Sequence, residues 1–149
     1  MIEIDITGLR ELEQALAEIE KDMTRRSLAR RVLKKVAQPV ADVANQNAPV
    51  DPESTDAPLA GSYVVGTKLT KRQRREERRG DRDDVVMFVG TSNPAGVQQE
   101  FGNRRHSPQP HFRPAWDADR EGMLRRMREE LAREIEKTVA RQRVRAARG

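Results

Sequence analysis

The last segment of the chain, residues 115–148, most constrains the fold because its pattern predicts one very long helix. Apolar side chains recur on one face of such a helix, at Trp116, Leu124, Met127, Leu131, Ile135 and Val139. Thirty-four helical residues span about 50 Å, whereas a compact chain of this length has a radius of gyration of about 15 Å. We therefore expect this helix to project from the domain, with its apolar face buried as far as Ile135.

The N-terminal third predicts a short strand and two helices. Residues 1–6 alternate apolar and acidic side chains, as a half-buried strand does. Thr7 can cap a helix that places Leu9, Leu12, Leu16, Ile19 and Met23 on one face. A second helix from Thr24 places Leu28, Val32, Val36, Val40 and Val43 on one stripe and stops at residues 48–49. Pro39 lies within that stripe, so a kink or break is expected at residues 35–38.

The middle of the chain predicts a small antiparallel sheet and a short helix. Residues 50–61 form a loop, and residues 62–69 and 84–91 are rich in strand-forming side chains. If these segments pair, the charged block between them, at 70–84, is the tip of a long hairpin. A short helix at 95–101, ended by Gly102, precedes a proline-rich loop. The predicted fold is a single α+β domain over 1–149, with the small sheet packed against two N-terminal helices and the long C-terminal helix.

The charge is concentrated at the C-terminus. Residues 137–149 hold five basic and no acidic side chains, so this basic helical extension alone accounts for the net charge of +5. A body of balanced charge weakens the case for a dedicated nucleic-acid-binding domain. The block at 71–84 holds seven basic and five acidic residues and is expected to be solvated.

Residues suited to catalysis are scarce. The chain has no Cys and two His, which excludes thiol chemistry and disulfides. His106 and His111 lie among arginines, which disfavours a metal ion. The six-residue spacing of Gly90, Gly96 and Gly102 fits no phosphate-binding loop. We therefore expect no enzyme activity, no cofactor and no metal, and the absence of a long apolar run predicts no membrane partner.

Three residues near the last helix have two possible roles each. Glu100 is expected to accept hydrogen bonds from backbone amides of the following loop rather than to act as an acid or base. Phe112 and Trp116 are expected to anchor the core, and contacts between subunits are their alternative role.

Three short motifs resemble a known family. Residues 89–91 (Val-Gly-Thr), 97–103 (Val-Gln-Gln-Glu-Phe-Gly-Asn) and 110–115 (Pro-His-Phe-Arg-Pro-Ala) occur in this order. In that order they resemble the neck or tail-completion proteins of long-tailed bacteriophages, prophages and gene transfer agents. The motif and structural residues singled out here are Gly90, Glu100, Phe101, Gly102, Pro110, Phe112, Arg113, Pro114 and Trp116.

The resemblance implies a structural virion protein at the head-to-tail junction. Such proteins form rings, commonly sixfold, between the head-closure protein and the tail terminator or tail tube, around the channel for double-stranded DNA. The protein would reside in the host cytoplasm during assembly and in the virion afterwards.

Basic residues could contact either DNA or a protein partner in such a channel. The candidates are Lys68, Lys71, Arg72, Arg74, Arg75, Arg78, Arg79, Arg141, Arg143, Arg145 and Arg148. The acidic residues of the 70–84 tip favour a protein partner there, whereas the acid-free tail suits both partners equally. The alternative function is a small nucleic-acid-binding protein that uses its basic C-terminal helix without sequence preference.

Overall fold

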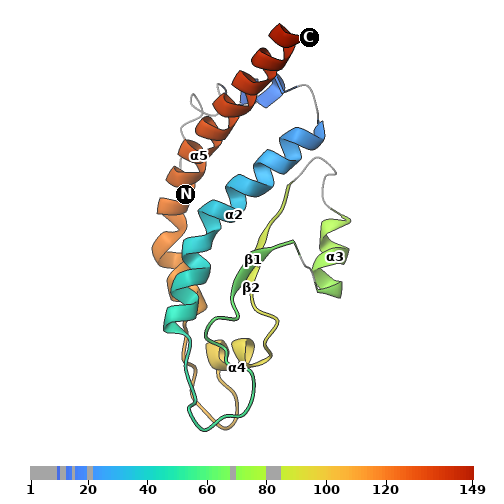
Figure 1. Cartoon of the computed structure of the whole chain (residues 1–149). Helices are drawn as coiled ribbons and strands as arrows, with labels where there is room; N and C mark the ends of the chain where they lie inside the picture. The colour runs from blue at the N-terminus through green and yellow to red at the C-terminus, as the bar shows by residue number, and fades with distance from the viewer. Residues whose placement is uncertain (1–9, 11–12, 15, 20–21, 68–69, 80–84) are drawn as a thin grey trace.

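The computed structural model has a mixed α+β fold that is mostly helical. It describes residues 10, 13–14, 16–19, 22–67, 70–79 and 85–149. The elements in chain order are α2 (Asp22–Asn47), β1 (Val64–Gly66), α3 (Lys71–Glu77), β2 (Phe88–Gly90), α4 (Ala95–Phe101) and α5 (Phe112–Arg148). The expected α+β class is confirmed (Figure 1).

The N-terminal elements are described only in part. The strand expected at 1–6 lies outside the described residues. Residues 10, 13–14 and 16–17 are helical, as expected for the first helix, but residues 18–19 are not, and α2 begins at Asp22 rather than at Thr24.

Helix α2 runs without a break through Pro39, so the break expected at residues 35–38 is wrong. The expected kink fits the change in direction of its axis near the middle (Figure 1). Its buried stripe contains Leu28, Val32, Val36 and Val40 as expected. Val43 is 37% exposed, because the second half of α2 turns a face with Ala41 and Ala44 toward the sheet.

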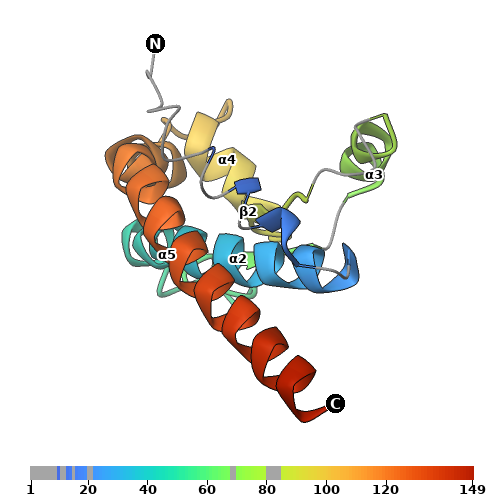
Figure 2. The same cartoon turned by 90° about the horizontal axis from the view of Figure 1, so that it is seen from above.

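Helix α5 packs antiparallel to α2, and its last turns extend beyond the start of α2 (Figures 1 and 2). It begins at Phe112, three residues earlier than expected, with Pro114 in its first turn, where no backbone donor is needed. At the start of α5, the buried face of the helix lies one residue away from the apolar stripe that the sequence predicted. Ala115 is buried, whereas Trp116 and Leu124 are 41% and 37% exposed, so Trp116 is not the expected core anchor.

The core consists of two clusters along α2. The sheet cluster joins the second half of α2 to β1, the preceding loop and the start of α5; it contains Ala37, Val40, Ala41, Ala44, Ala48, Leu59, Tyr63, Val65 and Ala115. Phe112 packs against it, as expected for a core anchor. The helix cluster joins the first half of α2 to α5; it contains Ile19, Leu28, Val32, Val36 and Ile135. Met123 of α5 packs against both clusters.

The two strands pair antiparallel, as predicted, with Val65 opposite Val89, but each has only three residues. The predicted charged tip differs from expectation because residues 71–77 form helix α3. Thr70 and Gln73 cap this helix reciprocally: Thr70 N donates to Gln73 Oε1 at 2.9 Å, and Gln73 N donates to Thr70 Oγ1 at 3.2 Å. A capping box before a run of good helix formers explains why the block is helical.

Candidate functional site: a polar junction and a basic surface

A buried carboxylate joins α4 to the start of α5. Glu100 is 4% exposed. Its Oε2 accepts hydrogen bonds from the backbone N–H groups of His111 (2.9 Å) and Phe112 (3.0 Å), and its Oε1 accepts from the N–H of Arg113 at 3.0 Å. The Arg113 Nε also donates to Oε1 at 3.0 Å. The expected structural role agrees with these contacts, although the amides belong to the first turn of α5 rather than to a loop.

The charge of Glu100 is stabilised by this arrangement. Burial raises the pKa of the carboxyl group, but the three backbone amides and the Arg113 side chain outweigh burial and lower the pKa from 4.5 to about 2. A helix N-terminus also favours a negative charge. Glu100 is thus held ionised as a cap for α5, and it is poorly suited to exchanging protons at neutral pH.

A second buried contact joins the sheet to the same turn. The Tyr63 hydroxyl lies 2.5 Å from Nε2 of His111, whose Nδ1 lies 3.0 Å from the carbonyl of Gln109 and 3.2 Å from Glu100 Oε2. Both neighbours of Nδ1 are acceptors, so Nδ1 carries a hydrogen and, in the neutral ring, Nε2 accepts from Tyr63. Burial, and then the charge of Glu100, raise the pKa of Tyr63 to about 12.

Asn45 ties α2 to the segment before β1. Its Oδ1 accepts from the backbone N–H groups of Gly61 and Tyr63, both at 2.9 Å, and its Nδ2 donates to the Tyr63 carbonyl at 3.0 Å. Asn45 and Tyr63 were not among the residues predicted from the sequence. An Asn in the last turn of the predicted helix and the single Tyr of the chain were the available signals.

The polar groups of this junction are therefore occupied by structural contacts. Among the described residues no three His, Cys, Asp or Glu side chains gather where they could hold a metal ion. None of the helices in the described part of the chain is long and apolar enough to span a bilayer.

The remaining motif residues surround this junction or lie on the surface. Phe101 is 59% exposed, and the Arg113 guanidinium lies 4.5 Å from the centre of its ring. Gly102 ends α4 with a φ of 74°, and a Cβ there would lie 2.8 Å from the backbone nitrogen of Pro108, so glycine is required. Gly90 ends β2, and Pro110 is exposed.

The candidate contact residues fall into two separate groups. Lys71, Arg72, Arg74 and Arg75 lie in α3 and are followed by Arg78 and Arg79, whereas Lys68 lies outside the described residues. Arg141, Arg143, Arg145 and Arg148 are exposed on the last turns of α5.

The structure adds a basic segment that the sequence analysis missed. Residues 24–41 of α2 contain six basic and no acidic side chains, namely Arg25, Arg26, Arg30, Arg31, Lys34 and Lys35. Antiparallel packing brings the start of this segment, at Thr24, beside Thr138 and Arg141 of α5, and we call residues 24–41 and 137–149 together the basic surface. The basic surface holds eleven basic residues, which leaves 18 basic against 24 acidic residues in the rest of the chain.

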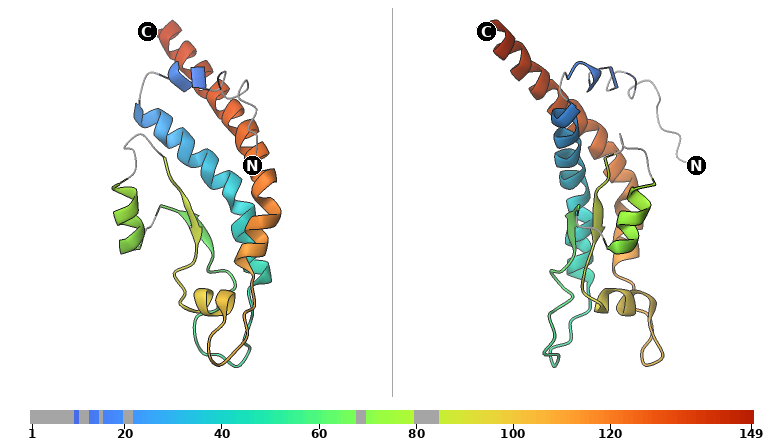
Figure 3. Two further views of the ribbon diagram at one scale, coloured as in Figure 1. Left: turned by 180° about the vertical axis from the view of Figure 1, so that it is seen from behind. Right: turned by 90° about the vertical axis from the view of Figure 1, so that its right-hand side faces the viewer.

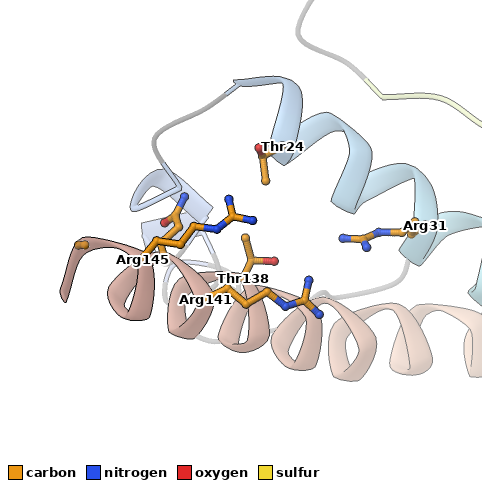
Figure 4. A pocket seen from close by; sticks show the side chains of 7 residues that line it. Thr24, Arg31, Thr138, Arg141 and Arg145 are labelled. Atoms are coloured by element: carbon orange, nitrogen blue, oxygen red, sulfur yellow. The ribbon is translucent and has the colours of Figure 1, made fainter. Parts of the chain in front are cut away.

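A groove of about 570 Å³ opens within the basic surface, between α2 and α5. Thr24, Arg31, Thr138, Arg141, Gln142, Arg145 and Ala146 line it. Figure 4 shows the guanidinium groups of Arg31, Arg141 and Arg145 lying in the space between the two helices. Glu134 borders the groove on one side, where it lies 3.6 Å from Arg31, and one turn further from the groove Glu130 lies 3.0 Å from Lys35.

These features define a small mixed α+β protein. Its buried polar side chains join the helices to one another and to the sheet, and its basic residues are concentrated on one part of the surface. Residues 10–102 match the model of the family described as "Bacteriophage HK97-gp10, putative tail-component". The match covers more than half of the chain, which therefore belongs to this family of bacteriophage tail components. No curated protein and no solved structure matches the chain.

The family confirms the resemblance drawn from the motifs and gives the chain a structural role in a phage tail. The matched range contains α2 to α4 and stops at Gly102, so the Pro110–Ala115 motif and all of α5 lie beyond it.

Proposed function

We propose that this protein is a subunit of the head-to-tail connector. It assembles as a ring, sixfold in the resembling proteins, between the head-closure protein and the tail terminator or tail tube, around the DNA channel. The observation that carries the proposal is the family match over residues 10–102. The occupied polar groups of the Glu100 junction support a role without catalysis.

A subunit of a cyclic ring contacts its neighbours through two different faces, and exposed apolar side chains on α4 and at the start of α5 are candidates for one of these faces. Val97 and Phe101 are 68% and 59% exposed, four residues apart on the outer face of α4. Trp116 is 41% exposed near the start of α5, so the contact role that the sequence left open for it is part of this proposal. We assign α3, with its mixed charge, to a protein partner rather than to DNA.

Assembly with the neighbouring connector proteins tests the proposal. Purified protein would be mixed with the head-closure and tail-terminator proteins of the same phage, and examined by native mass spectrometry and negative-stain imaging. A closed ring of defined subunit number is expected. Persistent monomers that never enter a particle would contradict the proposal.

Nucleic-acid binding is the second candidate function, and the basic surface is the observation that favours it. It predicts binding of any duplex with an affinity that falls steeply as salt rises. Deletion of residues 141–149 should abolish binding if the C-terminal helix is the phosphate contact. Intact binding after this deletion would exclude that role for the tail.

A further inference from the structure

We infer that the groove between α2 and α5 receives the acidic loop at residues 51–56 of a second copy of this chain. The inference rests on the proposed ring and names one of its contacts. Its physical basis is the complementary charge of two surfaces at opposite ends of the same molecule.

The groove presents unpaired positive charge. Arg141 and Arg145 are exposed, and the structure records no ion pair for either of them with a described residue. Arg31 contributes a third guanidinium group from α2, which also pairs with Glu134 at 3.6 Å (Figure 4). Guanidinium groups bind carboxylates through paired hydrogen bonds, so a groove lined by three of them suits a short acidic segment.

The acidic loop is a matching ligand of fixed shape. Residues 36–67 contain no Lys or Arg, and Asp51, Glu53 and Asp56 are exposed. Asp51 Oδ1 accepts a hydrogen bond from Glu53 N at 3.0 Å, and Ser54 Oγ accepts from Asp56 N at 3.2 Å. Because the loop is already ordered by its own turns, binding costs little conformational entropy.

The loop cannot fill the groove of its own chain. The loop follows the end of α2, whereas the groove lies beside the start of α2. Figure 3 shows the two ends of α2 at opposite ends of the molecule. A contact between the loop and the groove is therefore head-to-tail, the type of contact that closes into a ring when the rotation between subunits permits it.

The neighbouring carboxylates favour a loop over a nucleic-acid backbone. Glu134 pairs with Arg31 at the edge of the groove, and one turn further along the two helices Glu130 pairs with Lys35. A continuous phosphate backbone laid along α2 and α5 would pass these carboxylates, whereas a loop of a few residues occupies the groove alone. Outside the basic surface the chain has more acidic than basic residues, so every copy also carries negative charge that the groove of a neighbouring copy can bind.

Reversing the charge of the groove and the charge of the acidic loop tests the inference. We would measure self-association by sedimentation and native mass spectrometry for the variants Arg141→Glu/Arg145→Glu and Glu53→Lys/Asp56→Lys, each alone and combined. Each pair alone should weaken self-association by about ten-fold or more, and the combination should restore at least part of it. Arg104→Glu/Arg105→Glu makes the same change in net charge as the groove variant, in the exposed loop after α4, and should leave self-association unchanged.

The inference is overturned if the groove and loop variants associate like the unaltered protein, or if the combined variant does not recover. It is also overturned if Arg141→Glu/Arg145→Glu lowers only the affinity for a duplex DNA probe. A ring that still forms from the groove variant with the connector partners contradicts this contact and leaves the proposed function intact. An unaltered protein that never assembles contradicts both. Circular dichroism of each variant verifies that it is folded.

Discussion

At the scale of single residues, Glu100 holds the end of α4 against the start of α5 and so fixes both ends of the loop between the two helices. One side chain accepts hydrogen bonds from three successive backbone amides at the start of α5. The sequence predicted a carboxylate bound to backbone amides, because an isolated Glu at a helix end has few other roles. It could not identify the donors, since these depend on where α5 begins.

The first prediction concerns acid stability. The pKa of Glu100 lies at about 2 in the folded chain instead of 4.5, so its ionised form contributes stability above the unfolded pKa. That contribution, about 3 kcal/mol, is lost as the pH falls from about 5 toward 2. Urea unfolding across this range should show the loss in the unaltered protein.

Glu100→Gln should lack this part of the pH dependence and should be less stable at neutral pH, because a neutral amide oxygen replaces the carboxylate. Glu129→Gln, at an exposed site on α5, is the matched control. An unchanged pH profile for Glu100→Gln would show that the carboxylate does not stabilise the junction.

The second prediction concerns Tyr63, which is the single Tyr of the chain, so an ultraviolet absorbance titration reports on it alone. Burial and the charge of Glu100 raise its pKa from 10.0 to about 12. We expect ionisation near pH 12 in the folded protein and near 10 in urea. The stability that the neutral phenol contributes is present below pH 10 and disappears as the pH rises through 12. A folded midpoint near 10 would place the hydroxyl in solvent rather than against His111.

At the scale of elements, the sequence predicts a helix best where residues close to its two ends determine where it begins and where it stops. Asn93-Pro94 and Gly102 bracket α4 at the predicted residues, because the cap and the stop signal both lie within the segment. Helix α3 was missed although its capping box, Thr70 and Gln73, is visible in the sequence. Trp116 was wrongly assigned to the core because apolar periodicity does not reveal which turn of a helix faces its partner.

The third prediction concerns the end of α5. Its last buried side chains are Ile135 and Thr138, so removing residues 141–149 should change the free energy of unfolding by less than about 1 kcal/mol. Truncation after Glu134 removes Ile135 from the helix cluster and should cost about 2–5 kcal/mol. Denaturant unfolding of the two truncated chains makes the comparison. A large loss from the shorter deletion would mean that the last turns support the fold.

At the scale of the whole molecule, the important property is a separation of charge that the linear sequence conceals. The tail was recognised as basic, but residues 24–41 were interpreted through their apolar stripe. Their positive charge becomes significant only when antiparallel packing places the start of this segment beside the start of the tail. Pairings between distant segments are what a single sequence specifies least directly.

The fourth prediction concerns hydrogen exchange over the molecule. Residues 36–44 of α2 lie where the two clusters meet and include Val36, Val40 and Ala44, each at most 2% exposed. Their amides should exchange slowest, and those of residues 141–148 should exchange fastest in the monomer. Mass spectrometry of exchanged protein measures both. Strong protection of the last turns in a proven monomer would contradict this order.

The fastening of α5 by Glu100 has a practical consequence for labelling the protein. The loop at 103–110 begins with a turn in which Asn103 Oδ1 accepts hydrogen bonds from the N–H groups of Arg105 and His106. Near its other end, the N–H of Gln109 donates to the carbonyl of Gln99, and Ser107 is exposed between these two contacts. A short epitope inserted before Ser107 should leave both contacts in place, and would give electron microscopists a marker for the orientation of each protomer.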